Sequence, residues 1–328
     1  MFPEAPIYTL IYNENKIWDI FPSSKVKVAP ITQKIFKWTK NQRFCLPFMS
    51  RAVESLDLSE YDVVIADNSA FVHWCITKPE TKFIVYYHTP ARYMWDRTNE
   101  YKKEIWWNSW IKKAVLNYML KWLRAWDFQA SQRHDITLCN SFNVAKRLKK
   151  YYKLDAWIIY PNVDVERFDR ELETTFEKPF WHYYIIVSAL TEFKNISIAI
   201  EAFNQMTDKN LVIVWAWNYS ETLKSQIKAF NIKMVWPKYD DELVYLMQNA
   251  SWLVFAWEED FWIVPIEAMA CWIPVFAYKW GGLEETMIEW ITWEFFLDIK
   301  GWDFASKFIE FDKQLQAWKY NQNLIKRH

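Results

Sequence analysis

Short apolar runs that end in polar or turn residues recur along the whole chain, and this pattern restricts the fold more than any other feature. Such runs, without polar alternation, predict strands that are buried on both faces, as in parallel sheets. The first half contains YDVVIAD, KFIVYYH, DITLCNS and AWIIYPN, and the second half contains YYIIVSA, LVIVWAW, SWLVFAW and IPVFAYK. Helical patterns lie between the later strands, at Ile196–Met206, Ser220–Phe230, Asp240–Asn249 and Pro265–Cys271. This alternation predicts an α/β fold built from parallel βα units.

A charged stretch, Asp164–Trp181, interrupts this rhythm, and we expect the domain boundary within it. The prediction is an N-terminal domain of residues 1–168 and a C-terminal domain of residues 169–328, each with its own core. Both are expected to be doubly wound, Rossmann-like domains that face a cleft. Ligands of such sheets bind at the C-terminal ends of the strands, so the cleft is the expected site.

The net charge of the chain is zero, but the two predicted domains carry opposite charges. Residues 1–168 hold 25 Lys/Arg and 17 Asp/Glu, whereas residues 169–328 hold 15 and 23. A basic half suits phosphates or anionic lipid, although solvated helix faces explain such a charge equally well. The four cysteines form no metal-ligand pattern, and no run is long and apolar enough to span a membrane. We expect a cytoplasmic protein, with peripheral contact at the inner face of an anionic membrane.

Glycine and tryptophan occur in numbers that do not suit an α/β protein. The chain has 3 glycines and 23 tryptophans, although tight turns and helix C-caps need residues that tolerate positive φ. Together these two residue types make up about 8% of the chain, close to the ordinary glycine share of about 7%. Several tryptophans follow apolar runs or end helical segments, where glycine is expected: Trp215, Trp217, Trp236, Trp257 and Trp272.

We hypothesise that the gene uses a code in which one codon means glycine, and that this recoded glycine codon was translated here as tryptophan. The alternative is a chain that is genuinely rich in tryptophan, with bulky side chains that strain many turns. Trp95 and Trp126, each followed by Asp, are candidates for genuine tryptophans. The aromatic residues between Lys102 and Phe128 resemble an interfacial membrane helix, but the hypothesis attributes much of that pattern to recoding.

The most informative segment is EEDFWIVPIEAMACWIPV, which combines a strand exit with the start of a helix. Glu259 lies in the loop, Glu267 lies on the following helix, and Phe261 and Pro265 stand between them. The segment resembles the signature of family-4 retaining glycosyltransferases of the GT-B fold. In that family, a glutamate, a Phe-Gly pair, a proline and a second glutamate recur at this spacing. Trp262 stands where the family has glycine.

The resemblance implies a role for each of these residues. Glu259 would hold hydroxyls of the donor sugar, and Glu267 would hold the ribose hydroxyls of the nucleotide. Phe261, Trp262 and Ile263 would belong to the donor site at the helix start, where backbone N–H groups approach the ligand. The alternative is a surface glutamate and a helix-face glutamate without a ligand.

Two further segments of the second half resemble the same family. SALTEFKNISIAIEAF resembles a strand, loop and helix in which a basic residue meets the donor diphosphate, and Lys194 occupies that place. Many relatives have an arginine where Ala189 stands, so Lys194 would be the main side-chain charge on the diphosphate. KWGGLEETM resembles a glycine-rich loop that cradles the diphosphate, and it offers Gly281, Gly282 and Glu285. An exposed loop lysine and a plain turn before a helix are the alternatives.

The first half carries YYHTPARYMWD, which resembles a segment of bacterial polysaccharide and O-antigen mannosyltransferase-like members. It places His88 at the end of a strand facing the expected cleft. An isolated histidine is usually structural, whereas this position implies an active-site role. Relatives begin with a further strand and a glycine-rich loop, and nothing here resembles them, so the N-terminal strand is expected to be missing.

These features imply a retaining glycosyltransferase with Glu259, His88 and Lys194 as catalytic residues. It would move a hexose, mannose by resemblance, from a nucleotide-diphosphate sugar to a lipid-linked or polysaccharide acceptor. The leaving diphosphate would be stabilised by Lys194, by N–H groups near Gly281 and Gly282 and by a helix dipole.

No cofactor is expected, and the lack of a paired Asp-x-Asp predicts catalysis without a metal. Nucleic acid is not an expected partner. One alternative function is an inactive module that binds a nucleotide sugar or a lipid. Another is a nicotinamide oxidoreductase, but no GxGxxG follows the first strand, even with Trp read as Gly.

Overall fold

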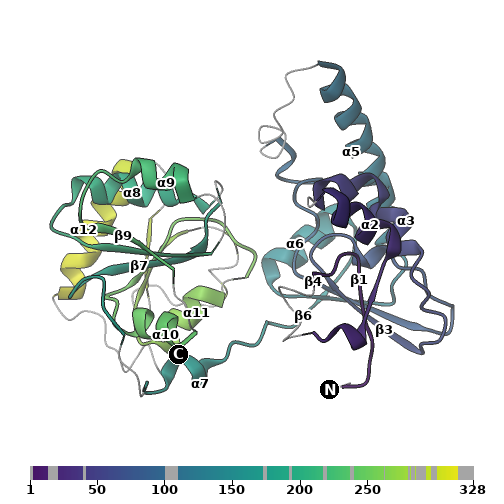
Figure 1. Cartoon of the computed structure of the whole chain (residues 1–328), viewed down its shortest axis with the longest axis horizontal. Coiled ribbons are helices and arrows are strands. Elements are labelled where there is room, and N and C mark those ends of the chain that lie inside the picture. The colour runs from purple at the N-terminus through teal and green to yellow at the C-terminus, as the bar shows by residue number, and fades with distance from the viewer. Residues whose placement is uncertain are drawn as a thin grey trace. The chain divides into compact units, whose positions relative to one another are not determined.

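The structure of the protein is a computed structural model that divides into two compact units, Met1–Tyr160 and Pro161–His328 (Figure 1). The sequence predicts a boundary after residue 168. This position lies within the short helix α7 (Val165–Asp169), near the start of the second unit. The residues that the structure describes are 3–13, 21–39, 42–99, 110–172, 176–191, 194–216, 220–236, 240–261, 263–279, 281, 285, 293–296 and 301–316.

The first unit contains a parallel sheet of four strands in the order β3-β4-β5-β6, and a separate parallel pair, β1-β2. Helix α5 is long and projects beyond the rest of this unit (Figure 1). The strands are β1 (Ile7–Thr9), β2 (Val26–Val28), β3 (Val63–Asn68), β4 (Lys82–Tyr87), β5 (Ile136–Cys139) and β6 (Trp157–Ile158). The helices are η1 (Ser23–Lys25), α2 (Pro30–Thr39), η2 (Gln42–Phe48), α3 (Met49–Glu54), η3 (Val72–Trp74), α5 (Trp110–Ala130) and α6 (Phe142–Tyr151).

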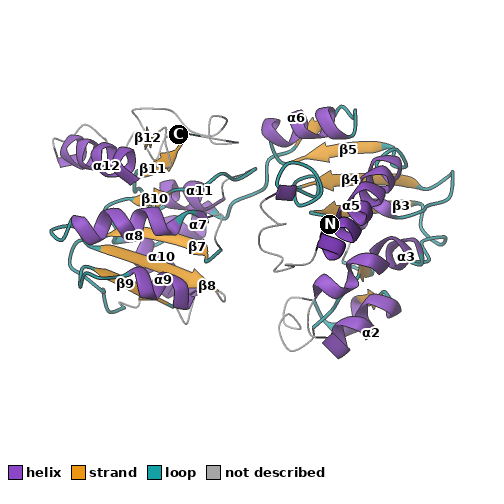
Figure 2. Ribbon diagram, turned by 90° about the horizontal axis from the view of Figure 1, so that it is seen from above, coloured by secondary structure: helices purple, strands orange, loops and turns teal. Residues whose placement is uncertain are grey.

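The second unit contains a six-stranded parallel sheet in the order β12-β11-β10-β7-β8-β9. Helices α8, α9 and α12 cover one face, and α7, α10 and α11 cover the other (Figures 1 and 2). The strands are β7 (Tyr184–Ala189), β8 (Leu211–Ala216), β9 (Ile232–Val235), β10 (Leu253–Phe255), β11 (Val275–Tyr278) and β12 (Trp293–Phe296). The helices are α7 (Val165–Asp169), α8 (Ile196–Gln205), α9 (Ser220–Gln226), α10 (Asp240–Gln248), α11 (Ile263–Ala270) and α12 (Gly301–Gln316).

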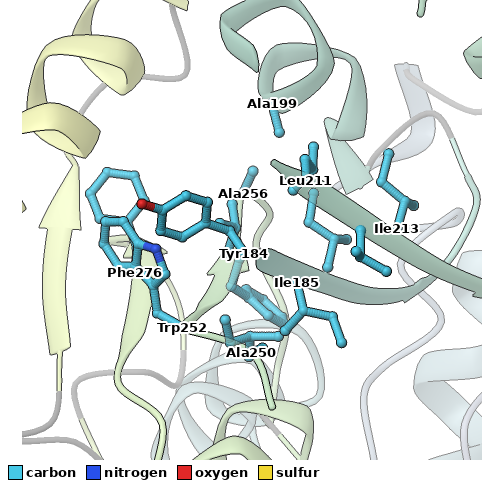
Figure 3. Packing of buried hydrophobic residues seen from close by; sticks show 14 of the residues in the cluster. Tyr184, Ile185, Ala199, Leu211, Ile213, Ala250, Trp252, Ala256 and Phe276 are labelled. Carbon is cyan, nitrogen blue, oxygen red and sulfur yellow. The ribbon is translucent and has the colours of Figure 1, made fainter. Parts of the chain in front are cut away.

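Aromatic rings fill the core between the second sheet and α12. The Trp252 ring centroid lies 5.0 Å from that of Tyr184, 5.5 Å from that of Phe276 and 4.7 Å from that of Phe308. Tyr184, Trp252 and Phe276 lie beside one another in Figure 3. Each large apolar side chain that is removed from water stabilises the fold by about 1.5–3 kcal/mol, so this cluster fixes α12 against the sheet.

The predicted α/β architecture with parallel sheets is confirmed, and most predicted elements lie within a few residues of their expected bounds. Helix α9 is an exception, because it ends at Gln226 and not at Phe230. The Asn204 side chain accepts the backbone N–H groups of Lys228 and Ala229 at 2.8 and 3.2 Å. These groups would otherwise continue the helical ladder, so a distant side chain decides where this helix ends.

Candidate functional site

The order of strands in the second sheet reverses between β7 and β10. From β7 the chain adds β8 and β9 on one side, and then crosses to β10 on the other side. The connections that follow β7 and β10 therefore lead to opposite sides of the sheet, and ligands of such sheets bind at the carboxyl ends of the strands at such a point. Lys194 follows β7 and Glu259 follows β10. The predicted donor residues thus belong to the two loops at this point of reversal.

Lys194 and Glu259 form an ion pair between their ammonium and carboxylate groups. The Lys194 side chain is 9% exposed and the Glu259 side chain is 39% exposed. Trp257 contacts both, since the Lys194 Nζ lies 4.9 Å from its ring centroid and its indole N–H donates to Glu259 Oε2 at 3.3 Å. A carboxylate and an aromatic face thus take the place of the water that the buried ammonium group has lost.

Gly281 brings the predicted glycine-rich loop against the Glu259 loop. Its φ is +86°, which L side chains rarely adopt. A Cβ built on Gly281 would lie only 2.6 Å from the backbone carbonyl oxygen of Glu259. Glycine is therefore required here for two reasons, the left-handed backbone and the close approach of two loops.

Helix α11 begins directly after the Glu259 loop and carries two of the remaining predicted residues, Ile263 and Glu267. Phe261 is 9% exposed and Ile263 is 43% exposed. Glu267 is partly buried, and burial raises the pKa of its carboxyl group while Arg167 opposes this shift. Trp262 and Gly282 lie outside the described residues, whereas Glu285 is described and partly buried. The structure thus brings Lys194, Glu259 and Gly281 together and leaves the nucleotide role of Glu267 as a prediction.

Helix α11 ends in a Schellman motif centred on Trp272. The N–H of Trp272 donates to the carbonyl of Met269 at 2.9 Å, and the N–H of Ile273 donates to that of Ala268 at 3.1 Å. The φ of Trp272 is +65°, in the left-handed region where this motif usually has glycine. Its indole N–H donates to the carboxylate of Asp169.

In the first unit, His88 follows β4 and pairs with a residue that the sequence motifs did not indicate. Its Nε2 lies 2.5 Å from Oδ1 of Asp67, near the end of the neighbouring strand β3. The hydrogen bond raises the pKa of His88 and lowers the pKa of Asp67. Asp67 closes the apolar run YDVVIAD, so its place at a strand end was the available signal.

A buried carboxylate, Asp127 on α5, is a second feature that the sequence did not indicate. Its Oδ1 accepts from the Trp74 indole at 2.9 Å and lies 3.0 Å from His73 Nε2. Its Oδ2 accepts from the Trp95 indole and from the Tyr152 hydroxyl, both at 2.7 Å. These hydrogen bonds lower the pKa of Asp127 against the opposing effect of its burial, which is the largest single influence. The network ties α5 to η3, to the turn at Trp95 and to the end of α6.

No group of three or more His, Cys, Asp or Glu side chains in the described part of the chain is arranged to hold a metal ion. None of the helices described above combines the length and apolar character needed to cross a bilayer.

Comparison with known families assigns both halves of the chain. Residues 14–167 match Glycosyltransferase Family 4, and residues 165–321 match Glycosyl transferases group 1. Taken together, the two matches extend over residues 14–321 and the chain belongs to the group 1/family 4 glycosyltransferases.

Curated relatives are distant. The alpha-1,3/1,6-mannosyltransferase ALG2 of Kluyveromyces lactis is 24% identical over 306 residues, which cover 79% of this chain and 58% of that protein. An uncharacterised glycosyltransferase of Methanocaldococcus jannaschii is 27% identical over 164 residues, which cover 49% of this chain and 44% of that protein. The chain thus spans less than two thirds of the length of either relative.

Solved structures agree on the fold. A glycosyltransferase from Rickettsia africae has a TM-score of 0.57 at 16% identity, covering 99% of this chain and 91% of that chain. Anabaena HepE in complex with UDP-glucose has a TM-score of 0.61 at 13% identity, covering 97% and 92%. Sucrose-phosphate synthase from Thermosynechococcus elongatus has a TM-score of 0.65 at 17% identity, covering 98% and 82%. The predicted GT-B fold is confirmed.

Proposed function

We propose that the protein transfers a hexose, with retention, from a nucleotide-diphosphate sugar to an acceptor. The observation that carries this proposal is the cluster of Lys194, Glu259 and Gly281 at the point of strand reversal in the second sheet. It joins a buried cation, a partly exposed carboxylate and a backbone loop that only glycine can form. These are the groups needed to hold a diphosphate and a sugar side by side.

In the proposed reaction, the bond between the anomeric carbon and the diphosphate oxygen breaks, and the acceptor oxygen attacks from the same face. The departing diphosphate takes the acceptor proton, so stabilising its negative charge is the main catalytic task. Lys194 supplies a positive charge, and the N–H groups at the start of α11 and near Gly281 supply partial charges. Glu259 exchanges its ion pair for hydroxyls of the donor sugar, and Glu267 holds the ribose.

A pair of lysine variants tests this assignment. Lys194→Ala should lower the rate of transfer about 100-fold or more, while donor affinity changes less, because charge develops on the diphosphate as the sugar bond breaks. Lys228→Ala removes an exposed lysine of the same unit and serves as the control. The assay is release of nucleoside diphosphate with UDP-glucose or GDP-mannose. A Lys194→Ala variant that loses only affinity would assign this lysine to ground-state binding.

The finer identity of the substrates extends the proposal. Mannose as the transferred sugar is supported by the mannosyltransferase of K. lactis, and use of a nucleotide sugar is supported by the UDP-glucose complex of HepE. A lipid-linked or polysaccharide acceptor follows from the resemblance of the His88 segment. Measuring transfer from several nucleotide sugars to several acceptors tests both the sugar and the acceptor. A preference for glucose would contradict mannose as the transferred sugar.

Peripheral contact with an anionic membrane, on the cytoplasmic side, is proposed for the basic N-terminal half. Exposed Tyr118 lies on α5, three residues before Lys121. Aromatic rings and lysines on one helix suit the interface between lipid headgroups and acyl chains. The test is cosedimentation with vesicles that contain anionic phosphatidylglycerol, compared with neutral vesicles. Binding that does not depend on anionic lipid contradicts the proposal.

A recoded glycine codon remains our explanation for the tryptophan content. The left-handed backbone of Trp272 supports it, because a bulky residue is rare at the end of a Schellman motif. Trp217, Trp262 and Trp280 lie outside the described residues. The codons of the source gene at these positions decide the matter, since standard tryptophan codons not subject to reassignment would end the hypothesis.

The alternative function is an inactive module that binds a nucleotide sugar or a lipid. Ala189 favours it, because many relatives have an arginine there for the diphosphate. The discriminating measurement is turnover: an enzyme releases nucleoside diphosphate repeatedly, whereas a binding module holds the donor intact.

A further inference from the structure

The C-terminal end of β3 holds His88 at two points. The Asp67 carboxylate oxygen Oδ1 lies 2.5 Å from Nε2 of the His88 ring. The backbone N–H of His88 also donates to the carbonyl oxygen of Asn68 at 2.9 Å. Both the ring and the backbone of His88 are therefore fixed by consecutive residues of one strand.

This end of β3 is itself anchored in the core of the first unit. Asn68 is fully buried, and its Oδ1 lies 3.1 Å from Nδ1 of His73. The other ring nitrogen of His73 lies 3.0 Å from Asp127, the carboxylate that also accepts from two indoles and a tyrosine. These contacts link the end of β3 to the buried side chains of His73 and Asp127, so Asn68 holds this end of the strand in place beside His88.

The remaining nitrogen of His88 is open to a ligand. Its side chain is 42% exposed, and Nδ1 has no hydrogen-bond partner within the described residues. The groups that face the ring are Asp67 from β3 and Tyr86 from β4, whose ring centroid lies 5.1 Å away. The Tyr86 hydroxyl donates to the carbonyl of Ile159 at 2.8 Å and not to the His88 ring.

We infer that Asp67 is a positioning residue, which keeps Nε2 of His88 turned toward β3 and Nδ1 available to an oxygen of a ligand bound at this end of the first sheet. The inference rests on the proposed function for the identity of that ligand. A histidine whose one nitrogen donates to a carboxylate has a defined orientation at the other nitrogen. When the ring is protonated, Nδ1 donates a hydrogen bond to a sugar hydroxyl or phosphate oxygen.

The experiment compares Asp67→Asn with Asp62→Asn in the full chain. Asp62 is exposed and directly precedes β3, at the end opposite to Asp67. Its replacement by Asn removes the same charge. The titration of each histidine ring is followed by NMR of the ¹⁵N-labelled imidazole groups, and His88→Gln identifies the His88 signal. In parallel, release of nucleoside diphosphate from UDP-glucose and GDP-mannose is measured between pH 5.5 and 9.

We expect the His88 pKa to lie above about 6.5 in the unmodified chain and to fall toward that value in Asp67→Asn but not in Asp62→Asn. Asp67→Asn should also lower kcat/KM about tenfold and move the pH profile with the His88 titration. An unchanged His88 titration overturns the inference, and so does a changed titration with an unchanged pH profile. If the unmodified chain releases no diphosphate, the proposed function fails, and the titration still decides whether Asp67 holds the ring.

Discussion

Replacement of Trp272 by glycine and by alanine in parallel measures whether this position calls for glycine. Both variants lose the indole hydrogen bond to Asp169 and the same contacts of the ring. They differ in how each residue tolerates the φ of +65°. The difference in stability between the two variants therefore isolates the cost of a Cβ at this backbone conformation.

The expected magnitude follows from two opposing contributions. A residue with a Cβ in the left-handed region costs about 1–2 kcal/mol. Glycine loses more conformational freedom on folding than alanine does, which costs it about 0.4–1 kcal/mol. The Trp272→Gly variant should therefore be more stable than the Trp272→Ala variant by about 1 kcal/mol.

The assay is urea unfolding, followed by circular dichroism, with the same two substitutions at Trp122 as the control. Trp122 lies inside α5, where glycine is about 0.8–1 kcal/mol less favourable than alanine. The sign of the difference should thus reverse between the two positions. An alanine variant that equals or exceeds the glycine variant at Trp272 would refute the argument from backbone strain, and the recoding hypothesis would lose its structural support.

Three further predictions concern charge and the sheet edge. Burial raises the pKa of Glu267, so its charged form is costly in the folded protein, and Glu267→Gln should stabilise the free protein above about pH 5. The same substitution should weaken nucleotide binding by about 1–3 kcal/mol in calorimetry. Burial, followed by the effect of His73, lowers the pKa of His134 to about 4, so protonation favours the unfolded chain as pH falls below about 6.5. His134→Gln should therefore reduce the loss of unfolding free energy between pH 7.5 and 4.5 by about 2–3 kcal/mol; an equal loss would contradict this. Ile65 is 59% exposed on the edge strand β3, so Ile65→Thr should lower self-association in light scattering without a change in melting temperature.

Much of the fold could be predicted from local patterns. Strands of a parallel sheet are buried on both faces, because helices cover both faces of the sheet. Each strand therefore needs apolar residues throughout, and each apolar run can be recognised on its own. Lys194 and Glu259 could be identified as neighbours for a similar reason. Each follows a strand of one parallel sheet, and such strands end at the same edge.

The bounds of several elements and the partner of each polar side chain could not be predicted in this way. Asn204 ends helix α9 from a different helix, and nothing in the sequence near Gln226 marks that end. Asp67 pairs with His88 because β3 and β4 align Asp67 with Tyr86, and a shift of the register by one residue would turn it to the other face.

The amino-acid sequence by itself determined the α/β class, the strand positions and the residue types available for a sugar-phosphate site, because these depend on local hydrophobic patterns and on residues that follow strands. Only the tertiary structure decided that Gly281 lies against Glu259, that Trp272 has a left-handed backbone and that Asp127 gathers donors from three separate segments. Contacts of this kind depend on strand order and register. Strand order and register are set by the packing of the whole unit, and no short segment of the sequence contains that information.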